Sequence, residues 1–129
     1  MPVRRRDIAA PDAPEAAGGY AQAVETTGAE RVLYVSGQIP ASRDGTVPAD
    51  FKAQCRLAWR NVEAQLRAAD MSLDNLVKVT TYLADRRHAG ENRAIRQEVL
   101  GDRRPALTVI VAGIFDEAWL VEIEAIAAT

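Results

Sequence analysis

The sequence has very few of the residues that carry metal, redox or disulfide chemistry. Its 129 residues include one cysteine, Cys55, and one histidine, His88. A single cysteine cannot close a disulfide within the chain, and one Cys with one His cannot complete a Cys/His zinc site. We therefore expect no metal and a reducing compartment, the cytoplasm.

The sequence also lacks an excess of charge of either sign. Sixteen Lys and Arg stand against 18 Asp and Glu, which gives a formal net charge of −2. Nucleic-acid binders usually present a strongly positive surface. The arginines at 4–6 and 86–87 have no interleaved aromatic residues on which bases could stack. We predict no nucleic-acid partner and interpret these arginines as solvated surface.

Long apolar segments are absent as well. The longest apolar run extends from about Leu107 to Phe115, about half of the ~20 residues that a membrane-spanning helix needs. The arginines at 4–6 are followed by Asp7 and a proline-interrupted stretch, not by the apolar core of a secretion signal. We expect no membrane partner and no export.

The composition is that of one folded domain. The chain falls within the ~100–150 residues of a typical domain. Hydrophobic residues make up 48% and charged residues 26%, which are ordinary globular values. No internal repeat or linker is visible, so we predict a single domain over residues 1–129.

Hydrophobic periodicity predicts two helices and four or five strands. Ala49–Ala69 contains no Gly or Pro and carries an apolar stripe at helical spacing. Arg86–Leu100 is a second, highly charged helix that ends at Gly101. The predicted strands are Val3–Ile8 (a weak signal), Arg31–Ser36, Leu76–Leu83, Ala106–Ile114 and Trp119–Ala127. The order β(β)αβαββ indicates an α+β fold with a mixed sheet.

Two helices can cover only one face of such a sheet. Ala106–Ile114 is nevertheless apolar on both of its faces, which predicts a strand buried on both sides. The sequence offers no third helix, so another subunit is the simplest cover for the second face. We place the last strand, Trp119–Ala127, in the centre of the sheet.

Three single residues receive structural rather than catalytic interpretations. Cys55 lies on the apolar stripe of the first helix, which predicts a core thiol and not a nucleophile. Trp59 borders the same stripe and is expected to join the core. His88 follows two arginines and is expected to be exposed to solvent.

Several short motifs together resemble one known family. They are Gly19-Tyr20-Ala21-Gln22-Ala23-Val24, Ser36-Gly37-Gln38-Ile39-Pro40, Asn61-Val62, Pro105-Ala106 and Val121-Glu122-Ile123-Glu124-Ala125-Ile126-Ala127. The chain resembles the Rid/YjgF family of reactive-intermediate (imine and enamine) deaminases, known under an older label as endoribonuclease L-PSP. The resemblance runs from about Gly18 to the C-terminus.

The resemblance implies a chorismate-mutase-like α+β fold, with two helices on one face of the sheet. It implies a homotrimer with clefts between its subunits. It also implies hydrolysis of 2-aminoacrylate-type enamines and imines to 2-oxo acids and ammonia, with no cofactor.

The same resemblance assigns the residues of the cleft. Tyr20 and Glu122 would be catalytic, and Glu122 would position or protonate the hydrolytic water. The residues implied to bind the substrate are Ser36, Gly37, Gln38, Asn92, Leu107 and Thr108.

Leu107 departs from the family pattern. Where the family has an arginine that grips the substrate carboxylate, in a Pro-Ala-Arg-Ser segment, this chain reads Pro105-Ala106-Leu107-Thr108. Leucine offers no hydrogen-bond donor, so affinity for a small 2-imino acid should fall ~30-fold or more. Arg103 or Arg104, just upstream, is the alternative holder of the carboxylate.

Three functions remain open at this point. The first is a Rid-type deaminase whose substrate preference is altered by Leu107. The second is a non-catalytic, trimeric ligand-binding or chaperone-like protein. The third, RNA cleavage, is the least favoured, because a ribonuclease normally needs two acid/base groups or a metal site and this chain has one histidine.

Overall fold

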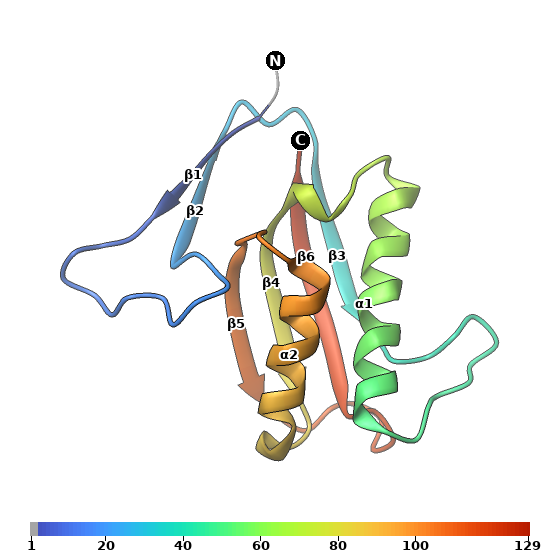
Figure 1. Ribbon diagram of the computed structural model, residues 1–129. Coiled ribbons are helices and arrows are strands. Elements are labelled where there is room, and N and C mark those ends of the chain that lie inside the picture. Colours follow the sequence, from blue (N-terminus) through green and yellow to red (C-terminus); the bar gives the residue numbers. More distant parts are fainter. Residues whose placement is uncertain (1–2) are drawn as a thin grey trace.

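A four-stranded mixed sheet forms the centre of the fold (Figure 1). The structure is a computed structural model that describes residues 3–129. The strands lie in the order β3-β6-β4-β5. β6 pairs antiparallel with both β3 and β4, whereas β4 and β5 are parallel. The strand bounds are β3 Val32–Gln38, β4 Leu76–Leu83, β5 Ala106–Val111 and β6 Val121–Ala128.

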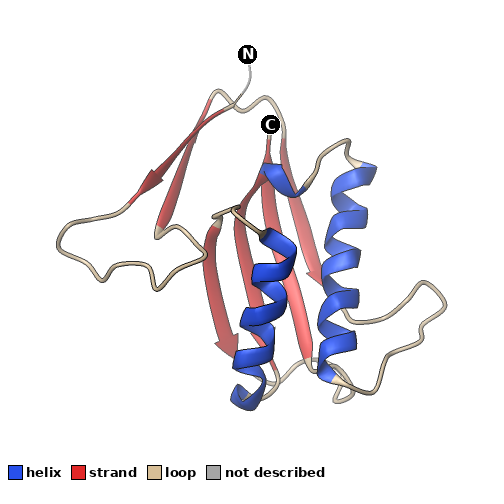
Figure 2. Ribbon diagram, viewed as in Figure 1, coloured by secondary structure: helices blue, strands red, loops and turns tan. Residues whose placement is uncertain are grey.

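Both long helices pack on the same face of this sheet (Figure 2). They are α1, Phe51–Ala68, and α2, Ala89–Leu100. Asp50 caps α1, because its carboxylate accepts a hydrogen bond from the Ala53 amide at 3.2 Å. Two single 3₁₀ turns, η1 (Leu73–Asn75) and η2 (Arg86–His88), precede β4 and α2.

A separate hairpin lies beside the β5 edge of the sheet (Figure 1). Its strands are β1, Arg4–Ile8, and β2, Ala23–Thr27, which pair antiparallel. Arg5 ties the hairpin to the main sheet by donating a hydrogen bond from Nη1 to the Leu76 carbonyl at 2.7 Å. The chain between β1 and β2 ends close to the start of β5, because Ala21 forms a parallel backbone bridge with Ala106.

Alternation along β6 divides the sheet into a helix-side face and an open face. Val121, Ile123 and Ala125 are buried among the core residues, whereas Glu122 and Glu124 are only half-buried. Successive strand residues point to opposite faces. The apolar set therefore faces the helices, and the glutamates lie on the face that no helix covers.

The structure confirms the predicted α+β class with both helices on one face. Leu76–Leu83 forms β4 with the predicted bounds, and the last strand is central, between β3 and β4. The predicted helix Arg86–Leu100 begins instead with the η2 turn, and its α-helical part starts at Ala89. Cys55 and Trp59 both lie in the core.

The predicted strand Ala106–Ile114 is shorter in the structure, and its burial on both sides with the help of a second subunit stays a prediction. Its strand ends at Val111 and forms the edge of the sheet, where Val109, Ile110 and Val111 are each at least 40% exposed. The segment is apolar although this chain leaves its second half uncovered.

The structure differs from the sequence-based prediction in two further places. No strand was predicted at β2, because its residues Glu25, Thr26 and Thr27 are polar and form no alternating pattern. His88 is buried and not exposed, since its ring stacks on Phe51 with centroids 4.4 Å apart. Within residues 3–129, no helix has the length and apolarity needed to cross a bilayer.

Replacing Trp59 by alanine should remove a central part of the core. The side chain is 1% exposed, so Trp59→Ala should lower the free energy of unfolding by ~3–5 kcal/mol, measured by urea denaturation. Trp119→Ala is the matched control, because Trp119 is half-buried and its neighbour Phe115 is 96% exposed. A loss at Trp59 no larger than that at Trp119 would contradict the assignment.

Candidate functional site

The predicted site residues fall on opposite faces of the sheet. Leu107 aligns with Val79 of β4, a core residue, and itself packs against the core on the helix side. Glu122 pairs with Tyr82 of β4, between the core residues Val121 and Ile123. Its side chain therefore points to the open face. A single chain therefore does not bring Leu107 and Glu122 together.

On the helix side, Tyr20 and Leu107 line one pocket of about 230 Å³. A backbone bridge holds the two segments together, because the Ala21 amide donates to the Pro105 carbonyl at 3.1 Å. The phenol oxygen of Tyr20 accepts a hydrogen bond from the Ala17 amide at 3.1 Å. We call this the helix-side pocket; it is lined by Ala17, Gly18, Tyr20, Arg93, Arg96, Leu107 and Val109.

Asn92 does not line the helix-side pocket in the single chain. Its side chain is 2% exposed and faces α1, where its Oδ1 accepts a long contact of 3.9 Å from the Cys55 thiol. Burial raises the pKa of the Cys55 thiol to about 12. Cys55 and Asn92 thus form a contact between α1 and α2. On α2, Asn92 lies one turn before Arg96.

The two arginines proposed as alternatives to Leu107 differ in their surroundings. Arg103 pairs with Asp74, with Nε and Oδ1 2.7 Å apart. Arg104 is exposed and donates to the Tyr20 carbonyl at 3.3 Å. Arg103 is therefore already neutralised, and Arg104 supports the segment that carries Tyr20.

On the open face, Glu122 lies directly over the backbone of Gly37. A Cβ at Gly37 would lie 2.8 Å from Glu122 Cδ and would overlap its Oε2. Only glycine allows this approach. The register between β3 and β6 also slips between Val35 and Gln38. The end of β3, Ser36-Gly37-Gln38, thus leaves room for the Glu122 carboxylate.

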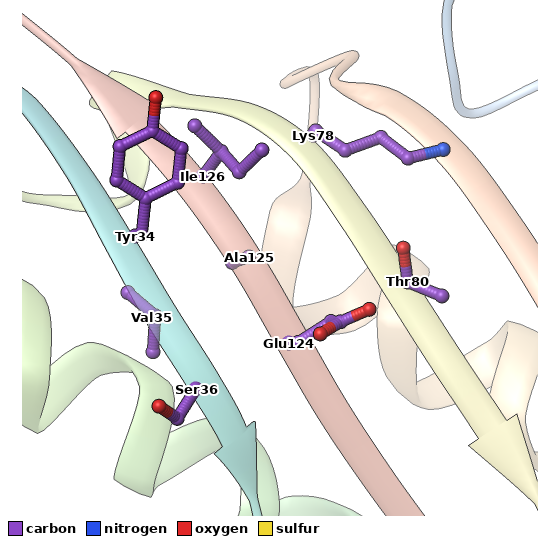
Figure 3. A pocket seen from close by; sticks show the side chains of 8 residues that line it. All are labelled: Tyr34, Val35, Ser36, Lys78, Thr80, Glu124, Ala125 and Ile126. Atoms are coloured by element: carbon purple, nitrogen blue, oxygen red, sulfur yellow. The ribbon is translucent and has the colours of Figure 1, made fainter.

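Polar side chains from three strands share the open face (Figure 3). Thr108, also predicted to bind substrate, accepts a hydrogen bond there from Lys78 Nζ at 2.7 Å. Tyr82 donates to Glu124 at 2.8 Å, and this hydrogen bond raises the pKa of the phenol. Figure 3 shows the depression of about 340 Å³ on this face; it is lined by Tyr34, Val35, Ser36, Lys78, Thr80, Glu124, Ala125 and Ile126.

A model of the family described as endoribonuclease L-PSP matches residues 10–129. The chain belongs to this family, also called Rid/YjgF. The match covers both faces of the sheet and every predicted site residue.

Curated relatives of this Rid-family chain carry two kinds of name. A RutC family protein of Pyrococcus horikoshii is 36% identical over 90% of this chain and 91% of its own length. The 2-iminobutanoate/2-iminopropanoate deaminase of Mus musculus is 33% identical over 97% of this chain and 92% of its own. The Escherichia coli protein of the same name is 32% identical over 95% of this chain and 96% of its own length.

Solved structures agree with the fold of the Rid-family chain. The Rid protein YyfB of Yersinia pestis superposes with a TM-score of 0.82 over 97% of this chain and 98% of its own, at 24% identity. Escherichia coli TdcF, solved with bound serine, superposes with a TM-score of 0.72 over 96% of this chain and 98% of its own, at 29% identity.

The sequence reading missed two arginines that the structure brings to Tyr20 and Leu107. Arg93 and Arg96 lie in the charged second helix, where arginine is usually solvated, and Arg96 is only 6% exposed. The only available signal was that Arg96 follows Asn92 by four residues, which places both on one helix face. Among residues 3–129, no group of three or more metal-ligating side chains is close enough to hold an ion.

The Cys55 thiol should be inert in the folded protein. With a pKa of about 12, only about one thiol in 10,000 is ionised at pH 8. Ellman's reagent should therefore label the native protein at least ~100-fold more slowly than the protein unfolded in guanidinium. Equal rates would contradict the burial of Cys55 against Asn92.

Proposed function

We propose that this protein is a hydrolytic deaminase of a reactive enamine or imine. The observation that carries the proposal is the Glu122 carboxylate lying over Gly37, in a family that includes 2-iminobutanoate/2-iminopropanoate deaminases. A carboxylate beside the backbone of a strand end can hold a water molecule and exchange a proton with it.

The reaction requires only proton transfers and water. An enamine first takes a proton at carbon and becomes the imine. Water then adds to the imine carbon, its oxygen bonding to carbon while Glu122 relays its proton towards nitrogen. The carbon–nitrogen bond breaks, ammonia leaves, and the remaining hydroxyl loses its proton to give the 2-oxo acid.

The proposal includes a homotrimer, because the half-sites lie on opposite faces of one chain. Tyr20 and Leu107 would meet Glu122 of a neighbouring copy. The open face supports this arrangement, since no helix covers it and Tyr34 on β3 is 75% exposed. The exposed apolar half of β5 adds to the surface that a neighbour would bury.

The proposal also includes an altered substrate preference. Leu107 presents an apolar side chain to the helix-side pocket where the family has an arginine, so the smallest imines, of the 2-aminoacrylate type, should be poor substrates. The compartment proposed is the cytoplasm, as expected for a chain with one buried thiol. Two yeast relatives carry "mitochondrial" in their names, so fractionation of the source cells is the direct measurement.

A non-catalytic ligand-binding protein is the second candidate. The observation in its favour is Leu107 at the position that would hold the substrate, together with the serine bound in the TdcF structure. A binder would take up a small carboxylate without releasing ammonia, whereas a deaminase releases it catalytically.

Mixing two inactive variants tests the shared site. Glu122→Gln and Tyr20→Phe should each lower imine hydrolysis at least ~10-fold, because each removes one half of every site. A refolded 1:1 mixture should recover about a quarter of the wild-type activity, since that fraction of the interfaces in randomly mixed trimers joins two intact halves. Each variant refolded alone is the control, and light scattering checks the trimer mass.

No recovery in mixed trimers would show that both halves act within one chain. A particle of monomer mass at micromolar concentration would remove the trimer itself. Wild-type protein that hydrolyses no imine, although folded and trimeric, would favour the ligand-binding alternative.

Leu107→Arg should shift the preference towards the smallest imine. A guanidinium on β5 restores charge pairing with a nearby carboxylate, so kcat/KM for the 2-aminoacrylate imine should rise ~10- to 1,000-fold. Ala94→Arg adds the same charge on the exposed side of α2 and is the matched control. A folded Leu107→Arg protein without any gain would show that the substrate preference does not depend on a cation at this position.

A further inference from the structure

Arg96 is a buried cation without a counter-charge. Its side chain is 6% exposed, and its Nε has no hydrogen-bond partner among the described residues. No ion pair within residues 3–129 includes Arg96. Burial, followed by the charge of Arg93, lowers the pKa of Arg96. A buried guanidinium whose Nε lacks an acceptor is costly unless something supplies one.

The acidic residues of α2 do not supply that acceptor. Glu91 pairs with Lys52 at 3.8 Å, and Glu98 pairs with Arg56 at 3.3 Å. Both glutamates therefore turn towards α1. The helix leaves its unpaired positive charge on the other side, where it faces Tyr20 and Leu107.

Arg96 and Arg93 line the helix-side pocket from α2. Residues three apart on a helix are neighbours on its surface, so the two guanidiniums reinforce one another. Arg93 is exposed, and its Nη2 donates only a long hydrogen bond of 3.4 Å, to the Ala17 carbonyl. The pocket thus has one positively charged wall, formed by the buried Arg96 and the exposed Arg93.

The opposite wall of the pocket is apolar. Leu107 and Val109 project from β5 into the same space, and Val109 is 40% exposed. At about 230 Å³, the pocket is smaller than the ~300–1,000 Å³ of typical drug-sized ligand sites. A ligand that satisfies both walls is small, anionic at one end and aliphatic at the other.

We propose that Arg96 binds the carboxylate of the substrate in the helix-side pocket, while Leu107 and Val109 contact its aliphatic side chain. The guanidinium fork fits a carboxylate with two parallel hydrogen bonds. The proposal rests on the proposed function for the imine group, and it adds the residue that holds the carboxylate. The carboxylate is then held by α2 and not by β5.

Binding of 2-oxobutanoate, a stable carboxylate of the product class, tests the proposal without turnover. Isothermal titration should show saturable binding to the wild-type protein. The Kd should be at least ~10-fold higher for Arg96→Gln. Arg60→Gln, which removes an equal charge from an exposed position on α1, should leave the Kd unchanged. The uncharged amide of 2-oxobutanoate should not bind.

Two further variants separate ligand binding from a structural role. Arg96→Met removes the unpaired charge at similar volume, so the Tm without ligand should stay level or rise, and 2-oxobutanoate should no longer raise it. Arg93→Glu, at an exposed position, should give Arg96 an internal partner and also weaken binding. A lower Tm with the ligand-induced rise intact would overturn the proposal.

The outcomes distinguish this proposal from the proposed function. Arg96-dependent binding of 2-oxobutanoate without imine hydrolysis would remove the deaminase and keep the anion site. Imine hydrolysis with the same KM and Kd in wild type and Arg96→Gln would keep the deaminase and overturn the role of Arg96. Wild-type protein that does not bind 2-oxobutanoate also overturns it.

Discussion

The two-residue alternation of side chains along a strand governs the whole arrangement. It sends Val121, Ile123 and Ala125 of β6 into the core beneath the helices, and it sends Glu122 to the other side. The same alternation on β5 turns Leu107 to the helices and Thr108 away from them. Because the sheet separates the two half-sites, the shared, inter-subunit site that we propose follows from strand geometry.

The elements that the sequence predicted well are those whose signal is local. The α1 stripe and the alternation of β4 need no knowledge of the rest of the chain, and both appear where expected. The end of β5 was misplaced, because the apolar run continues to Ile114 although the pairing with β4 stops at Val111. Arg96 and His88 were missed because charged or polar residues are usually exposed, and only tertiary packing decides when they are not.

The family resemblance named candidate positions, and the structure sorts them by surroundings. Gly37 and Glu122 form one closely fitted contact, whereas Asn92 turns towards α1 and Arg103 towards Asp74. These differences could not be read from the sequence, because all four positions lie in segments of ordinary polarity. They depend on the directions of the side chains, which strand pairing and helix packing determine.

The backbone bridge between Ala21 and Ala106 also protects the sheet. An unpaired edge strand is a template on which other chains can add strands and aggregate. Here the segment that carries Tyr20 occupies the start of the β5 edge, and Arg5 anchors the adjoining hairpin to Leu76. The N-terminal hairpin thus shields that part of the edge, so the segment that shapes the pocket also limits unwanted self-assembly.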